Sequence, residues 1–446
     1  MDLEGYAKRM LREGIDREVI KEKLFQRVIE VKRDRIGEEE AINLVEAVIR
    51  EASLTLEPGD DLLKFPVSGV TMGELGVGSR GSGDFYFHEK IGELLGEGGA
   101  LIDSSMLDDS GVVKARGELI VLTVDGIHSR LSDFPFIAGF HVARAALRDI
   151  YAMGGVPVAL ASDIHLADDG DIGKVLDHIG GIAAVSELTG VPLITGSTLR
   201  IGGDMVIGDR MTGAVTAVGI ADVITPRKEA RIGDLILMSE GAGGGTISTA
   251  ALYHGEEEVV WETMNVKFID ACRTLIDRGL LSEIHSMTDV TNGGIRGDAA
   301  EIAKVAGVKL RFYEDKIRSL VNPRVLKLLE KYEIDYLGVS LDALLVICPE
   351  DVADRVLGAV RAAGVRMDIV GEVTEGRGSG IVIDGEERDF SPKFRESAYT
   401  PIKKVVGERA SRDFEEMKRS VDRVTGEVRR KKDWVVRRIR EAKNGL

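Results

Sequence analysis

The chain has few cysteines, few aromatic residues and no long apolar run. Only two of its 446 residues are cysteine, Cys272 and Cys348, and 5% are aromatic. Two thiols in apolar segments give no disulfide framework, which favours a reducing compartment. No apolar run approaches the ~18 residues of a membrane-spanning helix, and the first residues lack the basic-then-apolar order of a signal peptide. We therefore expect a cytoplasmic protein without a membrane partner.

Basic residues are also in the minority. The formal net charge is −16, with 59 Lys and Arg against 75 Asp and Glu. Nucleic-acid binding depends on neutralising phosphates with basic side chains. The composition therefore argues against nucleic acid as the main partner, although a small anionic ligand requires only a local site.

The two ends of the chain have helical patterns that differ in charge. Residues 1–58 carry apolar side chains at helical spacing and are predicted to form a helical N-terminal extension. Residues 401–446 are predicted to form a basic amphipathic helical tail, because Phe414, Met417 and Val421 recur every three or four positions among Arg and Lys. We expect this tail to pack on the acidic body. Self-association and a nucleic-acid contact are the alternatives.

Between these extensions, strand and helix patterns alternate. Buried strands are predicted at 119–124, 156–160 and 235–238, with a helix at 137–152. Both halves show the order strand, Gly-rich turn, helix, strand. A length of ~150 residues per domain and this order indicate two domains, at 59–222 and 223–400, of duplicated α+β type.

Acidic residues lie beside the apolar runs of the first half. Asp108 and Asp109 precede the strand at 119–124, Asp125 follows it, and Asp149 lies near the end of the helix at 137–152. Hard cations such as Mg²⁺ prefer oxygen ligands and bridge to phosphates. The pattern therefore predicts a Mg²⁺–nucleotide site.

Glycine-rich segments mark candidate ligand contacts. Residues 73–84 contain one G-x-G-x-x-G match, but no strand leads into it, so a mobile lid and a plain linker are the two interpretations. Gly293 and Gly294 permit close approach of the backbone to a ligand, and the helix predicted from about Gly297 would present N–H groups to an anion. Residues 241–245 suit a phosphate-binding turn or a simple tight turn.

Taken together, these segments resemble the PurM-like ATP-utilising proteins. The resemblance rests on 108–111, 124–126, 148–154 and 287–294, and covers roughly residues 60–400. Members include aminoimidazole ribonucleotide (AIR) synthase, hydrogenase maturation protein HypE, selenophosphate synthetase and thiamine-monophosphate kinase. The resemblance implies a two-domain α+β fold, with an N-terminal α/β half forming a dimer sheet or barrel and a C-terminal α+β half. It also implies a homodimer, because the family builds its nucleotide cleft at a two-fold interface.

The resemblance also assigns residue roles. The implied metal ligands, which hold Mg²⁺ against ATP phosphates, are Asp108, Asp109, Asp125 and Asp149. The implied ATP-binding residues are Thr123, Gly126, Arg148, Gly196, Ser197, Thr198 and Arg200. The candidates on the substrate side are Asp289, Thr291, Asn292, Gly293 and Gly294.

One departure from the family pattern leaves two functional interpretations. Ser197 stands where the family has a metal-binding Asp, and a hydroxyl brings no charge. The first interpretation is an ATP-dependent enzyme that uses Mg²⁺–ATP to phosphorylate or activate a small-molecule acceptor. The alternative is a nucleotide-binding regulatory or scaffold protein of the same fold with reduced catalysis.

Overall fold

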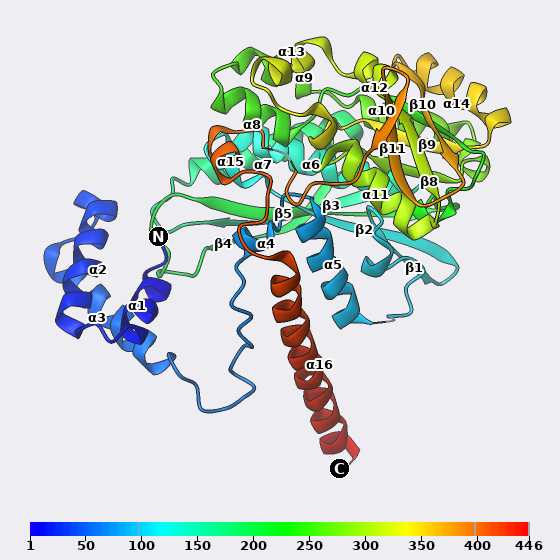
Figure 1. The fold of residues 1–446 in the computed structure, drawn as a ribbon. Helices are drawn as coiled ribbons and strands as arrows, with labels where there is room; N and C mark the ends of the chain where they lie inside the picture. Colours follow the sequence, from blue (N-terminus) through cyan, green and yellow to red (C-terminus); the bar gives the residue numbers. More distant parts are fainter. Residues whose placement is uncertain (97, 397, 445–446) are drawn as a thin grey trace.

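The computed structural model describes residues 1–96, 98–396 and 398–444, and their strands form two sheets (Figure 1). Each sheet belongs to one domain, and helices flank the two domains at both ends of the chain. The limits of the four predicted segments stay predictions, whereas the two-domain α+β architecture is confirmed.

The N-terminal extension is a bundle of three helices. They are α1 (Leu3–Arg12), α2 (Arg17–Lys32) and α3 (Glu38–Leu54). The Asp16 side chain accepts a hydrogen bond from the Glu18 N–H and so caps α2. The apolar faces form a separate small core that also includes Ile207 of the first domain. Lys32 joins the bundle to that domain through ion pairs to Asp168 (2.5 Å) and Asp169 (2.9 Å).

The first domain contains a five-stranded sheet in the order β1-β2-β5-β3-β4. Its strands are β1 (Gly111–Ala115), β2 (Glu118–Gly126), β3 (Val156–Leu166), β4 (Leu193–Arg200) and β5 (Met211–Ala221). Only the β3–β4 pair is parallel among the described pairings of this sheet. The helices α6 (Pro135–Ala152) and α7 (Gly173–Thr189) pack together, and α6 covers one face of the sheet.

The opposite face of this sheet is apolar and exposed. Period-two alternation in β2 buries Val121 and Thr123 toward α6 and exposes Leu122 and Val124. Exposed apolar side chains on the neighbouring strands extend the patch: Val156, Val158, Ile194, Leu199 and Ile220.

The second domain contains a seven-stranded sheet in the order β12-β11-β8-β10-β6-β9-β7. Its strands are β6 (Leu235–Ser239), β7 (Ser286–Asp289), β8 (Lys309–Tyr313), β9 (Leu344–Cys348), β10 (Met367–Thr374), β11 (Gly378–Ile383) and β12 (Glu386–Asp389). Its helices are α8 (Gly245–Tyr253), α9 (Val260–Thr263), α10 (Lys267–Asp277), α11 (Gly294–Ala306), α12 (Glu314–Leu320), α13 (Pro323–Lys331) and α14 (Glu350–Ala362). The helix predicted from about Gly297 begins three residues earlier than expected.

One apolar core spans both domains. It joins Val121 of β2 and Leu147 of α6 to Leu275 of α10 and Val346 of β9. Cys272 and Cys348 are free thiols buried in the same core, as their apolar segments predicted. Because the core is continuous, the two domains hold fixed faces toward one another, and side chains from both can form one site.

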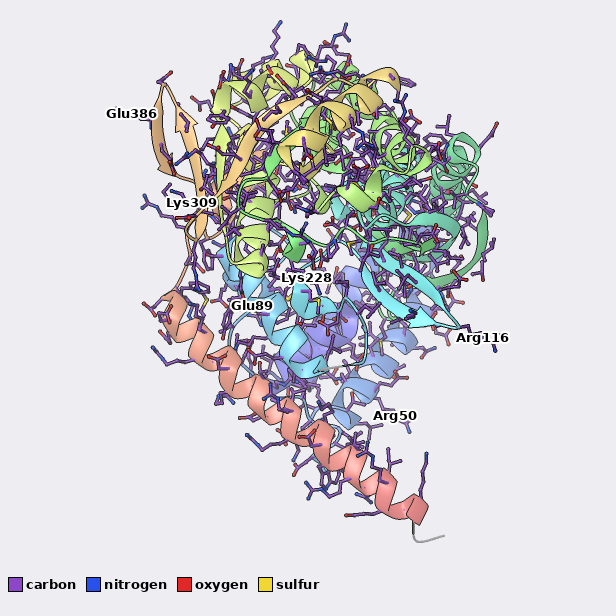
Figure 2. The ribbon with its side chains drawn as sticks, turned by 90° about the vertical axis from the view of Figure 1, so that its right-hand side faces the viewer. Arg50, Glu89, Arg116, Lys228, Lys309 and Glu386 are labelled. Carbon is purple, nitrogen blue, oxygen red and sulfur yellow. The ribbon has the colours of Figure 1, made fainter. Side chains whose placement is uncertain are left out.

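The C-terminal tail is only partly docked. It consists of α15 (Pro401–Val406) and α16 (Phe414–Asn444). Met417 and Val421 of α16 are buried together with Leu75, beside the aromatic side chains of α5 (Ser82–Leu95). Toward its end, α16 extends beyond the body, as both views show (Figures 1 and 2). Trp434 and Ile439 are exposed there, so the helix packs on the body through its first part, as expected, and not along its whole length.

The long loops before α5 carry the glycine-rich segment. The short helix α4 (Met72–Leu75) has a Thr71–Glu74 capping box and ends at Gly76, whose φ is +76°. Gly83 lies so close to the Leu75 carbonyl and to Phe394 that a larger residue would clash. In the described part of the chain, no helix is both long and apolar enough to cross a membrane.

Candidate functional site between the domains

A cavity of about 490 Å³ lies where the two domains meet. The end of β2 and the side of α6 form one wall, and the start of α8 and the loops before α11 and β9 form the other. The lining side chains with ionisable or hydroxyl groups include Asp125, His128, Arg130, His141, Arg148, Thr246, Thr291, Ser340, Asp342, Tyr399 and Lys403.

Two half-buried carboxylates mark the β2–α6 side of this site. Thr123 and Asp125 are two residues apart on β2 and therefore point to the same face of the sheet, toward α6. Thr123 Oγ1 donates a hydrogen bond to Asp149 Oδ2 at 3.0 Å, which links the strand to the helix. Neither Asp125 nor Asp149 forms a salt bridge with a basic side chain among the described residues.

Arginines of α6 bind the acidic residues of the second domain. Arg144 and Arg148 are four residues apart and share one helix face. Arg148 forms ion pairs with Asp289 and, at 2.8 Å, with Asp342. Arg144 also pairs with Asp342 and donates to the Thr263 carbonyl at 2.6 Å. This buried network holds α6 against the end of β7 and the loop that precedes β9.

Burial raises the pKa of three carboxyl groups at this site, whereas two arginines lower the pKa of a fourth. Burial, opposed by Arg148 and reinforced by Asp289, raises the pKa of Asp125 to about 6. Burial, with the charges of Asp289 and Asp125, raises the pKa of Asp149 well above its usual value. Burial also raises the pKa of Asp289 to about 6 despite Arg148. For Asp342, Arg148 and Arg144 together outweigh burial and lower the pKa to about 2.

A second buried network surrounds Arg227, at the start of the second domain. Its guanidinium pairs with Asp109 (2.6 Å), Glu301 (2.6 Å) and Asp298 (3.4 Å). Asp108 instead accepts the Arg227 backbone N–H at 2.7 Å. Asp109 further accepts from Thr288 Oγ1 at 2.9 Å. Burial outweighs Arg227 and raises the pKa of Asp109.

The four predicted metal ligands thus fall into two pairs. Asp108 and Asp109 lie in the Arg227 network, whereas Asp125 lines the cavity and Asp149 is bonded to Thr123, whose hydroxyl also lies 3.3 Å from the Asp109 carbonyl. Outside residues 97, 397 and 445–446, no three acidic, His or Cys side chains are arranged to share one metal ion. The role of these residues as metal ligands stays a prediction.

The predicted ATP-binding residues are similarly divided. Gly126 and Arg148 line the cavity, and Thr123 supports it through Asp149. The remaining candidates lie on the exposed edge strand β4, outside the lining: Gly196, Ser197, Thr198 and Arg200. Arg200 pairs with Asp168 at 2.7 Å, near the N-terminal bundle. The structure therefore does not bring the β4 group to this cavity within one chain.

The predicted substrate-side residues form the turn between β7 and α11. Thr291 and Asn292 line the cavity, and Asp289 lies beneath them in its ion pair with Arg148. Gly293 and Gly294 have φ of 101° and 65°, a region that favours glycine. The Asn292 side-chain N–H donates to the Gly78 carbonyl at 3.1 Å. The glycine-rich segment therefore lies against the cavity, as a lid would.

Two family descriptions match most of the two domains. "AIR synthase related protein, N-terminal domain" matches residues 107–221, and "AIR synthase related protein, C-terminal domain" matches 231–384. The chain belongs to the AIR synthase-related family. The predicted PurM-like fold is confirmed by these matches.

Relatives and solved structures of this AIR synthase-related fold extend the comparison. Uncharacterized protein MJ1416 of Methanocaldococcus jannaschii is 52% identical over 457 aligned positions and 99% of each chain. Selenide, water dikinase of Geobacter metallireducens is 32% identical over 241 positions, or 51% of this chain and 66% of that enzyme. HypE in complex with ATP superposes with a TM-score of 0.53 at 20% identity, covering 64% of this chain and 88% of HypE. AaThiL complexed with AMPPCP and TMP superposes with a TM-score of 0.51 at 20% identity, covering 64% of this chain and 90% of AaThiL.

Several cavity residues were not predicted from the sequence. Asp342 lies in a loop without a motif, and only the four-residue spacing of Arg144 and Arg148 could have indicated a buried acidic partner. Tyr399 and Lys403 follow the second matched family domain and reach the cavity because the chain folds back. No local pattern signals that return.

Proposed function

We propose that this AIR synthase-related protein binds Mg²⁺–ATP in the cavity between its domains and uses it to phosphorylate or activate a small-molecule acceptor. The observation that carries the proposal is a pair of carboxylates that form no salt bridge among the described residues: Asp125 lines the cavity, and Asp149 lies behind it, bonded to Thr123 of the same strand. Mg²⁺ is commonly held by one or two carboxylates together with substrate phosphates. The donor set therefore fits the ion.

The electrostatics of these carboxylates support a cation site. Their raised pKa values reflect burial and the repulsion between neighbouring acidic groups. A divalent ion relieves that repulsion in place of a proton. When bound, Mg²⁺ neutralises charge on the phosphates during transfer. The chain's own contribution is to hold Asp149 by Thr123 and to fix α6 through Arg148.

Proteins of the same fold support the choice of nucleotide. HypE has been solved in complex with ATP, and AaThiL with AMPPCP and TMP. The Asn292–Gly78 hydrogen bond suits a lid that excludes water from the phosphates. Phosphoryl transfer depends mainly on positioning and electrostatic stabilisation, which a rigid cleft between two domains with a shared core can supply.

A regulatory or scaffold protein of the same fold is the second candidate. Ser197 supplies no charge where the family has an Asp. Asp109 is already paired with Arg227. Both features favour fewer metal ions than a fully active site holds.

A homodimer is also part of the proposal. The open face of the five-stranded sheet carries apolar side chains on four strands, including Leu122, Val156, Ile194 and Ile220. Exposed apolar patches of this kind mark protein interfaces. A two-fold contact through this face would remove the patch from water.

The test is magnesium-dependent ATP turnover with a panel of phosphate-accepting and carboxylate metabolites, beside calorimetric titration of a non-hydrolysable ATP analogue. Turnover with one acceptor class supports the enzyme. Binding that requires Mg²⁺, without turnover on any acceptor, favours the scaffold. Absence of magnesium-dependent binding by the folded protein refutes both.

A further inference from the structure

The segment 398–407 closes one side of the cavity, although it follows the last residue matched by the family, 384. Tyr399 is 2% exposed, and its hydroxyl lies 2.7 Å from His128 Nε2 in the first domain. His128 Nδ1 lies 3.1 Å from Thr249 Oγ1 of α8. Thr400 then caps α15 by accepting the Lys403 N–H at 3.3 Å. These contacts place the Lys403 side chain in the cavity lining.

Two basic side chains in this part of the cavity lack acidic partners. Lys403 lies over the Tyr399 ring at 4.4 Å, and Arg130 lies over the Tyr253 ring at 4.2 Å. Neither forms a salt bridge with any described carboxylate. Burial and the charge of Arg130 lower the pKa of Lys403 to about 8. Partly buried cations are normally paired, so two neighbouring cations without a partner in an acidic protein indicate an absent anion.

Further polar groups face the same space. Gly245 and Thr246, at the start of the nine-residue helix α8, line the cavity. The first N–H groups of a helix have no partner inside it and favour an anion. His141 is 5% exposed and lines the cavity, and its Nδ1 has no partner among the described residues.

The charges in the cavity are segregated. The charged groups that act most strongly on Asp125 are Arg148, Asp289 and Asp342. Those that act on His128 are Lys403 and Arg130. Around Asp125, carboxylates therefore outnumber the one arginine, whereas the part of the cavity around His128 has two cations.

We propose that residues 398–407 complete an acceptor subsite in which Lys403 and Arg130 bind a phosphate or carboxylate group of the second substrate. The role of that group as acceptor rests on the proposed function. The basic subsite itself rests on the unpaired cations and the start of α8. A lysine supplied by the C-terminal segment would thus restrict the acceptor to anionic molecules.

The test uses inorganic phosphate and malonate as probes, titrated by calorimetry with and without Mg²⁺ and a non-hydrolysable ATP analogue. Lys403→Met and Arg130→Met are compared with Lys404→Met, which removes a neighbouring exposed lysine of the same helix. Loss of a charge-assisted contact should weaken probe binding by about tenfold or more in the first two variants and leave the third unchanged. The probe that binds more tightly identifies phosphate or carboxylate as the recognised group.

Several outcomes overturn the subsite. The first is that neither probe binds the wild-type chain, and the second is that probe affinity stays unchanged in both variants. The third is that both variants lose affinity for the ATP analogue as strongly as for the probes, which would assign the cations to the nucleotide. Lys403→Arg, which keeps the charge, should retain probe binding and so separates charge loss from misfolding. Failure of analogue binding with intact, Lys403-dependent probe binding refutes the nucleotide proposal and leaves the subsite standing.

Discussion

Replacing Asp125 with Asn should strengthen the fold while weakening the proposed Mg²⁺–ATP site. The carboxylate lies at the cavity without a described salt bridge, and its pKa is raised to about 6. Such a group costs stability when ionised, because the folded state holds the charge less well than water does. Asn keeps the shape of the side chain and removes the charge.

The size of the expected stability gain follows from the pKa shift of Asp125. A rise from 3.8 to about 6 corresponds to about 3 kcal/mol at ~1.4 kcal/mol per unit. Asp125 is only half-buried, so we expect the Asn variant to gain roughly 1–3 kcal/mol in free energy of unfolding near neutral pH. Below about pH 3 the carboxyl is protonated in both states and the gain should vanish, and at pH 4 most of it should already be lost. It should grow as pH rises toward 6 and stay constant above.

Urea denaturation across this pH range measures the stability change, and calorimetry with the ATP analogue and Mg²⁺ measures binding. Asp354→Asn, at an exposed position of α14, is the control and should change neither. A variant that is no more stable near neutral pH than near pH 4 would refute the electrostatic reasoning. Unchanged analogue affinity would remove Asp125 from the site.

Three further predictions concern the same features. Mg²⁺–ATP affinity should fall by about tenfold per pH unit below ~6, because one proton competes with the metal ion at Asp125, whose pKa is raised to about 6; calorimetry showing constant affinity between about pH 5 and 7 would contradict this. Arg227→Met should cost about 3–5 kcal/mol in urea denaturation by leaving buried carboxylates unpaired, whereas exposed Arg231→Met should change stability by less than about 1 kcal/mol. Leu122→Glu should give a monomer in light scattering; a wild-type monomer at micromolar concentration would disprove the dimer, and Leu188→Glu on α7 is the control.

Part of the fold could be read from local patterns. The helix expected at 137–152 is α6, and the strand expected at 235–238 lies within β6, because periodicity and glycine or proline boundaries act over a few residues. How far α16 stays docked could not be predicted, since its apolar side chains continue past the point where the body ends. The positions of Asp108 and Asp109 could not be predicted either, because Arg227, more than a hundred residues away, determines their partner.

The sequence by itself determined the element types, the acidic character and the family motifs, since these depend on residue identity and short spacings. Only the tertiary structure decided which charges meet. Buried arginines form ion pairs with Asp109, Asp289 and Asp342, whereas Asp125, in the cavity lining, and its neighbour Asp149 form none among the described residues. Likewise, only the return of the chain places Lys403 at the site. Electrostatic pairing depends on distance and burial in space, which separation along the chain does not reveal.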